Sequence, residues 1–183
     1  VVENGINVVL EKSDKFEAVL DGWSNLMPKV KLTVDGNGML TLEDENKFDF
    51  VRNPQNKTTV HLYYDGEISA ITSHSDGVIS HIDTLHTAGL TILAEDASGS
   101  IELTLKTAGV SIGTNNRNVA DIKLQGVAYG LGITNWGNAP INAQDFEVTN
   151  CDIVHRGPGD LYLNVTNTLS VTIYSIGDIY YKG

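Results

Sequence analysis

Two pairs of residues near the carboxyl end of the chain have types and a spacing that could bind a ligand. Tyr162 follows Asp160 by two positions, and Tyr180 follows Asp178 in the same way. If these positions lie on neighbouring strands, Tyr162 and Tyr180 stack, and we interpret them as an aromatic platform for sugar rings. The alternative is an ordinary cross-strand aromatic pair, which contributes roughly a few tenths of a kcal/mol to stability.

The two tryptophans, Trp23 and Trp136, are further aromatic binding candidates. A tryptophan is highly buried on average but seldom fully buried, so the alternative is that both are semi-buried packing residues. The sequence leaves both interpretations open.

Asp160 and Asp178 are the candidate metal ligands. Like charges on stacked positions repel, so the pair either faces solvent or shares a cation such as Ca²⁺, which prefers carboxylate oxygens. A calcium site gathers several oxygen ligands, so solvated turn aspartates are the alternative interpretation. His74, His81 and His86 match no zinc-binding spacing. We expect no cofactor.

No arrangement of residues in the sequence indicates catalysis. Glycoside hydrolysis needs two carboxylates that flank one bond, and a polysaccharide lyase needs calcium ligands beside a basic residue. Arg117, Lys123 and Arg156 stand in no evident register with a pair of aspartates. Nucleophile-elbow, phosphate-binding and dinucleotide motifs are also missing. We therefore expect a protein that is not an enzyme.

Strands must position these candidate residues. Apolar and polar residues alternate through most of the chain, as in Val30–Val34 and Ile101–Leu103. No long stretch keeps the apolar spacing of an amphipathic helix. The sequence therefore predicts an all-β fold.

Over residues 61–183 the strand pattern repeats about every 20 residues. One apolar column contains Ile79, Ile101, Ile122, Ile141, Leu161 and Ile179. Two positions before each member stands a glycine or an alanine: Gly77, Gly99, Ala120, Ala139, Gly159 and Gly177. A second apolar column, about ten residues earlier in each repeat, contains Leu90 and Ile92, Val110 and Ile112, Leu131 and Ile133, Cys151 and Ile153, and Leu169 and Val171.

These columns predict a single-stranded, right-handed parallel β-helix, or β-solenoid, of about six coils. Each coil stacks about 4.8 Å from the previous one and buries its apolar positions in a continuous core. The small residue marks a corner, where glycine allows positive φ or close packing of the coils. An antiparallel sandwich or barrel is the alternative, but it does not need the same small residue in every unit.

Residues 1–60 lack the period and are expected to form an antiparallel β cap on the first coil, within one domain that spans residues 1–183. Asp35-Gly36-Asn37-Gly38 lies between two apolar segments and predicts a hairpin. Ile179–Gly183 ends the repeats without an evident cap. This carboxyl-terminal edge is therefore a candidate for self-association.

Composition excludes several classes of protein. The 183 residues carry a net charge of −11, which argues against nucleic-acid binding because counterion release requires clustered Lys and Arg. No apolar run approaches the roughly 18 residues of a membrane-spanning helix. Cys151 is the single cysteine and falls in an inward column, so we expect a small buried hydrophobe.

The sequence resembles the family called putative auto-transporter adhesin, head GIN domain. Gly5-Ile6-Asn7-Val8 is similar to the tripeptide that gives the family its name, and Val60–Ile68 is similar to the strand that leads into its repeats. Ser175–Gly183 and Gly157–Leu161 resemble its Ser-Gly-Ser-Gly-Asp-Ile turns, whereas the turns that contain Ala120 and Ala139 lack those glycines.

The resemblance implies a β-helical bacterial protein that is secreted, periplasmic or on the outer surface, with a lipid anchor as one option. It implies no established catalytic residues and an unidentified protein or glycan partner. We expect a non-catalytic surface protein that binds its partner through the solenoid face. A carbohydrate-active enzyme, either a lyase or a hydrolase, and a structural or regulatory envelope domain without a ligand are the alternatives.

Overall fold

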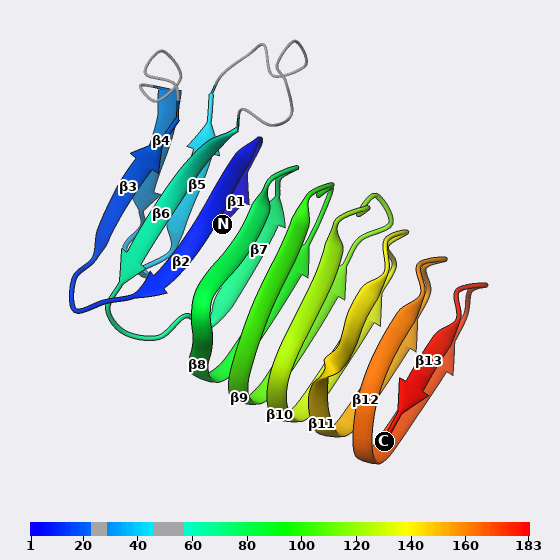
Figure 1. Ribbon diagram of the computed structural model, residues 1–183. Coiled ribbons are helices and arrows are strands. Elements are labelled where there is room, and N and C mark those ends of the chain that lie inside the picture. Colours follow the sequence, from blue (N-terminus) through cyan, green and yellow to red (C-terminus); the bar gives the residue numbers. More distant parts are fainter. Residues whose placement is uncertain (23–28, 46–56) are drawn as a thin grey trace.

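The computed structural model describes residues 1–22, 29–45 and 57–183 of the chain. In these segments every regular element is a β-strand, and the strands stack side by side along one axis (Figure 1). Most neighbours pair in parallel, and together they form a β-solenoid of about six turns. The predicted all-β parallel solenoid is confirmed.

The described strands, in chain order, are β1 (Val2–Glu3), β2 (Ile6–Lys12), β3 (Glu17–Asp21), β4 (Val30–Val34), β5 (Leu40–Asp44), β6 (Thr58–Tyr64), β7 (Ala70–His74), β8 (Val78–Ala94), β9 (Ser100–Thr114), β10 (Asp121–Asn135), β11 (Ile141–His155), β12 (Leu161–Ile173) and β13 (Ile179–Lys182).

Each of the strands β8 to β12 bends once and contributes to both faces of the solenoid (Figure 1). The opposite corner of each coil is a short turn, and these turns lie beside one another along the upper edge of the solenoid in Figure 1. We call this row the turn edge, and it consists of residues 75–77, 95–99, 115–120, 136–140, 156–160 and 174–178.

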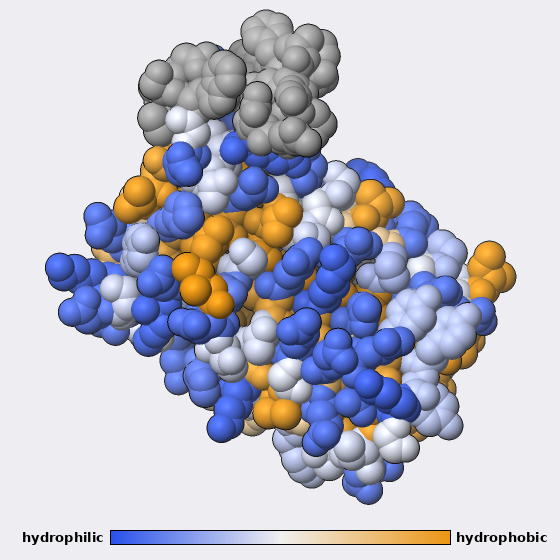
Figure 2. All heavy atoms as spheres, in the orientation of Figure 1, coloured by the Kyte–Doolittle hydropathy of each residue, from blue (hydrophilic) through white to orange (hydrophobic). Residues whose placement is uncertain are grey.

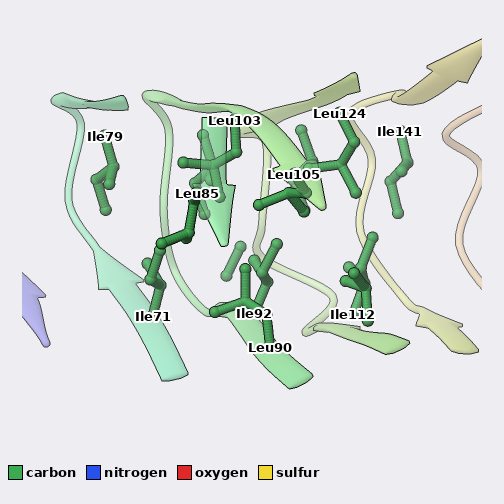
Figure 3. Close-up of a cluster of buried hydrophobic side chains, with 14 of the residues drawn as sticks. Ile71, Ile79, Leu85, Leu90, Ile92, Leu103, Leu105, Ile112, Leu124 and Ile141 are labelled. Carbon is green, nitrogen blue, oxygen red and sulfur yellow. The ribbon is translucent and has the colours of Figure 1, made fainter. Parts of the chain in front are cut away.

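The predicted apolar columns are in register. Ile79 pairs with Ile101, Ile101 with Ile122, and the series continues through Ile141 and Leu161 to Ile179. The second column pairs in the same way, and the side chains of both faces meet in one core (Figure 3). In the last coil the inward prediction is wrong for Val171, which is exposed because β13 covers only the first part of β12. Cys151 is buried in this core, and burial raises the pKa of its thiol to about 12.

Close packing explains the glycines of the turn edge. A Cβ atom at Gly99 would overlap the carbonyl oxygen of Gly77, and one at Gly159 would overlap that of Ala139. Neither Gly99 nor Gly159 has a positive φ. The backbone approach between coils, rather than turn conformation, therefore requires glycine at these two positions.

The expectation of an antiparallel cap over residues 1–60 holds for β3 and β4 but not for β1 and β2. β3 pairs antiparallel with β6, and β4 pairs antiparallel with β5. By contrast, β1 lies in parallel between β5 and β7, and β2 lies in parallel between β6 and β8. The first strands of the chain thus form a coil of the solenoid, inserted out of sequence order.

The predicted hairpin is present between β4 and β5. The carboxylate oxygen Oδ1 of Asp35 accepts hydrogen bonds from the N–H groups of Asn37 and Met39, at 2.9 and 2.8 Å. Gly38 has a φ of 80°, a conformation that glycine adopts without strain. The local turn chemistry therefore fixes this hairpin.

Candidate functional site

Tyr162 and Tyr180 stack on neighbouring coils, as predicted. They pair in the register of β12 and β13, and their ring centroids lie 5.0 Å apart with an angle of 10° between the ring planes. The two facing ring surfaces therefore cover each other. The pair offers ring edges and the outer side of Tyr180, which is 48% exposed, rather than two open faces.

Asp160 and Asp178 hold this pair of tyrosines. The hydroxyl of Tyr162 donates to Asp160 at 3.5 Å, and that of Tyr180 donates to Asp178 at 3.3 Å. The N–H of Asp178 also donates to the carboxylate of Asp160, at 2.9 Å. The negative charge of Asp178 raises the pKa of Tyr180, so this phenol remains protonated at neutral pH.

The described part of the structure places no third metal-ligating side chain with Asp160 and Asp178, the candidate calcium ligands. Within residues 1–22, 29–45 and 57–183, no group of three or more metal-ligating side chains is gathered. The two carboxylates accept hydrogen bonds from the chain itself. The metal site therefore stays a prediction from the sequence.

Trp136 lies at the start of a turn on the turn edge and is 45% exposed. The guanidinium carbon of Arg156 lies 4.9 Å from its ring centroid and 3.9 Å from the ring centroid of Tyr174. Three successive coils thus contribute a Trp–Arg–Tyr stack, which we call the ladder. Trp23 lies outside the described residues.

The ladder was only partly visible in the sequence. The sequence indicates Trp136 as a binding candidate and Arg156 as a base in no register with a pair of aspartates, but it gives no indication of Tyr174. The signal was the period, because each ladder residue directly follows one of the paired positions Asn135, His155 and Ile173. The stacking of the side chains themselves corresponds to no pattern in the sequence.

Thr114, Asn135 and His155 form a column of buried polar side chains, and the last two directly precede the ladder residues Trp136 and Arg156. Thr114 donates to the side-chain oxygen of Asn135 at 2.6 Å, and the amide nitrogen of Asn135 lies 3.3 Å from Nδ1 of His155. Burial lowers the pKa of His155. A neutral imidazole can accept the Asn135 hydrogen bond, so the buried column favours uncharged His155.

A hollow of about 430 Å³ lies near the amino-terminal coil, away from the ladder. It is lined by Lys12, Tyr64, His81, Asp83, Thr84 and His86. No pattern in the sequence indicates this hollow, because β2 brings together residues that lie far apart in the chain: Lys12 pairs with Tyr64 of β6, and Leu10 pairs with His81 of β8.

Both ring nitrogens of His81 have partners in this hollow. The hydroxyl of Tyr64 lies 2.9 Å from Nε2, and the carbonyl oxygen of Asp83 lies 2.8 Å from Nδ1. Burial raises the pKa of Tyr64, so its phenol is not activated as a nucleophile. Among the described residues that line the hollow, Asp83 is the single carboxylate, whereas glycoside hydrolysis uses two.

The face of the molecule drawn in Figure 2 is mainly hydrophilic. On the face drawn in Figure 2, hydrophilic side chains cover most of the coils and hydrophobic ones form small groups. Among the described residues, no helix has the length and apolar character that a membrane crossing needs.

Two solved structures share the fold. A putative adhesin of Bacteroides fragilis aligns with a TM-score of 0.78 and 19% identity, over 99% of this chain and 91% of its own. A putative adhesin of Parabacteroides merdae aligns with a TM-score of 0.59 and 16% identity, over 100% of this chain and 90% of its own. At these identities the likeness concerns the fold alone.

Among curated proteins, no relative matches the sequence. The model of one protein family, the family that the turn motifs resemble, matches residues 1–183. The chain therefore belongs to the family described as putative auto-transporter adhesin, head GIN domain.

Proposed function

We propose that this protein is a non-catalytic binding module of the bacterial envelope or surface, which acts as an adhesin through the turn edge of its solenoid. One observation carries the proposal: Trp136, Tyr174 and Tyr180 are exposed within the last coils and lie at or next to one edge. Parallel pairing of the coils fixes the backbone beneath them. Rigid exposed aromatic side chains are typical anchors of binding surfaces.

The family description and the names of the structural relatives support this proposal. The family is described as putative auto-transporter adhesin, head GIN domain, and both solved relatives are named as putative adhesins. We extend this to location and infer that the chain is secreted, periplasmic or on the outer surface, with a lipid anchor as one option. Surface proteolysis and fractionation of cells that produce the full-length protein test the location.

Binding is tested with purified protein on glycan arrays and on immobilised host-matrix proteins. We expect a ligand whose affinity falls about tenfold or more in Trp136→Ala, because anchor aromatics dominate binding energy. Tyr129→Ala is the matched control, since Tyr129 is also exposed but lies within β10 rather than on the turn edge. Binding that is lost in Tyr129→Ala and retained in Trp136→Ala would contradict the proposal.

The hollow at Lys12, Tyr64 and His81 is the concave site at which the alternative function, a polysaccharide lyase or hydrolase, can be tested. Screening neutral and acidic polysaccharides for reducing ends or unsaturated products tests it. We expect no product release, because burial raises the pKa of Tyr64 and the described residues of the lining include one carboxylate rather than two. Product release that Tyr64→Phe abolishes would replace the first proposal by the second.

A further inference from the structure

We propose that the ladder of Trp136, Arg156 and Tyr174 binds a carboxylate-bearing saccharide, such as a chain that contains hexuronic acid. This inference rests on the proposed function and names the class of ligand and the residue that selects it. Arg156 would pair with the carboxylate, and the exposed aromatic rings beside it would contact the sugar ring.

The stacking of Arg156 in the ladder leaves the N–H donors of its guanidinium available to a ligand. Its guanidinium carbon lies 4.9 Å from the ring centroid of Trp136 and 3.9 Å from that of Tyr174. Rings on two sides stabilise the cation through their π faces. The N–H donors of a guanidinium lie in its plane, so stacking against rings leaves them free to bind a carboxylate in a bidentate manner.

Arg156 has no acidic partner in the described part of the chain. Other cations of the solenoid do: Arg117 lies 3.4 Å from a carboxylate oxygen of Asp96, and Lys123 lies 3.2 Å from one of Glu102. Among the described residues, the Arg156 side chain forms neither an ion pair nor a hydrogen bond. An exposed guanidinium that is stacked but unpaired, in a chain of net charge −11, is available to an external carboxylate.

The ladder is organised before any ligand arrives. The N–H of Trp136 donates to Thr114 Oγ1 at 3.0 Å, that of Arg156 to the carbonyl of Asn135 at 2.7 Å, and that of Tyr174 to the carbonyl of His155 at 2.8 Å. These bonds tie each ladder residue to the preceding coil. A site whose backbone and stacking are already fixed loses less conformational entropy on binding.

An acidic saccharide fits these groups better than an acidic peptide does. A hexuronic acid carries its carboxylate and a flat face of C–H groups on one rigid ring. Tyr174 is 62% exposed and Trp136 is 45% exposed, so both offer ring surface close to the guanidinium. The repulsion from the net negative charge is screened beyond about 8 Å at physiological ionic strength, which leaves the local contact to decide the affinity.

The test compares oligogalacturonides with the same oligosaccharides after carboxyl reduction, which replaces each carboxylate by a neutral hydroxymethyl group. Affinities are measured by calorimetry at physiological salt. We expect the reduced form to bind about tenfold more weakly or worse, because a charge-assisted bidentate contact is lost. We also expect Arg156→Gln to lose the preference between the two forms.

Two further variants separate charge from geometry. Arg156→Lys keeps the charge but not the planar fork, so we expect an affinity between those of the wild type and Arg156→Gln. Arg117→Gln is the matched control, because Arg117 lies on the same turn edge and already pairs with Asp96; its affinity should equal that of the wild type. Circular dichroism confirms that each variant is folded.

Equal binding of the two oligosaccharide forms, or unchanged affinity in Arg156→Gln, would overturn the inference. If the protein binds only neutral glycans or a matrix protein through Trp136, the inference fails and the proposed function stands. If no glycan or matrix protein binds at all, both fail. Loss of binding in Arg117→Gln alone would move the site away from the ladder and would also overturn the inference.

Discussion

His155 is fully buried at the end of β11, directly before the exposed Arg156. Its Nδ1 faces the amide of Asn135, and a Cβ atom at Gly177 would press against its Nε2. Burial lowers its pKa below the ordinary value, because a charged imidazole loses its hydration there. We therefore expect His155, which directly precedes the ladder residue Arg156, to make the stability of the fold depend on pH in the acidic range.

The sign of this effect follows from proton linkage. Above the ordinary pKa of about 6.5, His155 is neutral in both the folded and the unfolded state, so its titration does not change the free energy of unfolding. As the pH falls below that value, the unfolded chain binds a proton that the folded chain does not, so the free energy of unfolding decreases. Urea midpoints at about pH 7.5 and about pH 5.5 measure the decrease.

His155→Gln should show a smaller difference between these two midpoints than the wild type, whatever its absolute stability. His86→Gln is the control, because His86 is exposed and its removal should leave the difference unchanged. An identical acid sensitivity in His155→Gln and the wild type would assign the effect to other groups.

Gly99 gives a second prediction at the scale of single residues. Gly99→Ala places a Cβ atom on the carbonyl oxygen of Gly77, so the coils must move apart and we expect the free energy of unfolding to fall by about 2–4 kcal/mol. Gly36→Ala is the control, since a Cβ atom there meets no atom within 4 Å. Chemical denaturation compares the variants, and equal stabilities would contradict the packing explanation.

At the scale of elements, β2 joins two parts of the molecule that its sequence position does not suggest. It pairs with β6 on one side and β8 on the other, and it brings Lys12 to Tyr64 at the hollow. Ile6, Val8 and Leu10 point into the core. The strands β3 and β6 are therefore attached to the coils that begin with β8 through β2.

Val8→Thr tests this dependence. Val8 is buried between β6 and β8, and its replacement by an isosteric threonine buries a hydroxyl, which should lower stability by about 1–3 kcal/mol. Val9→Thr is the neighbouring control on the outward side of the same strand, with an expected change below about 0.5 kcal/mol. Hydrogen exchange should show faster opening of β6 in Val8→Thr only, and equal exchange in both variants would refute the assignment.

At the scale of the whole molecule, the two ends of the solenoid differ. At the amino-terminal end, β3 adds an antiparallel pair beside β6, and the antiparallel pair of β4 and β5 lies beside β1. At the other end, β13 pairs only with β12 in the described residues. Val171, Ile173 and Tyr181 are exposed there. An edge strand beside exposed apolar side chains is a template for pairing with another chain.

We expect this protein, as the 183-residue chain, to self-associate at this edge with increasing concentration. Replacing Ile173 and Tyr181 together by lysine should shift the equilibrium to monomer, because charged residues block edge pairing. Tyr129→Lys, which adds one charge at an exposed site within β10, should not. Sedimentation equilibrium over about a hundredfold range of concentration measures the association, because the apparent mass of a self-associating protein rises with concentration by mass action. A monomer mass at every concentration would contradict the prediction.

Much of the fold was determined by the sequence itself. Because parallel coils stack in register, each apolar position has its neighbour one period away, and the series from Ile79 to Ile179 predicts the pairing. The same translation predicts the stack of Tyr162 on Tyr180. It also predicts the burial of Cys151.

Only the tertiary structure decided the features that this translation does not reach. The insertion of β1 and β2 between later strands depends on pairings between residues far apart in the chain. The alternation of apolar and polar residues in β2 is compatible both with this position and with a cap strand, so it does not predict the insertion. The ladder depends on side-chain conformations, because the period aligns Trp136, Arg156 and Tyr174 but does not turn the guanidinium between the two rings. A repeat specifies which residues are neighbours, whereas packing in three dimensions specifies which groups touch.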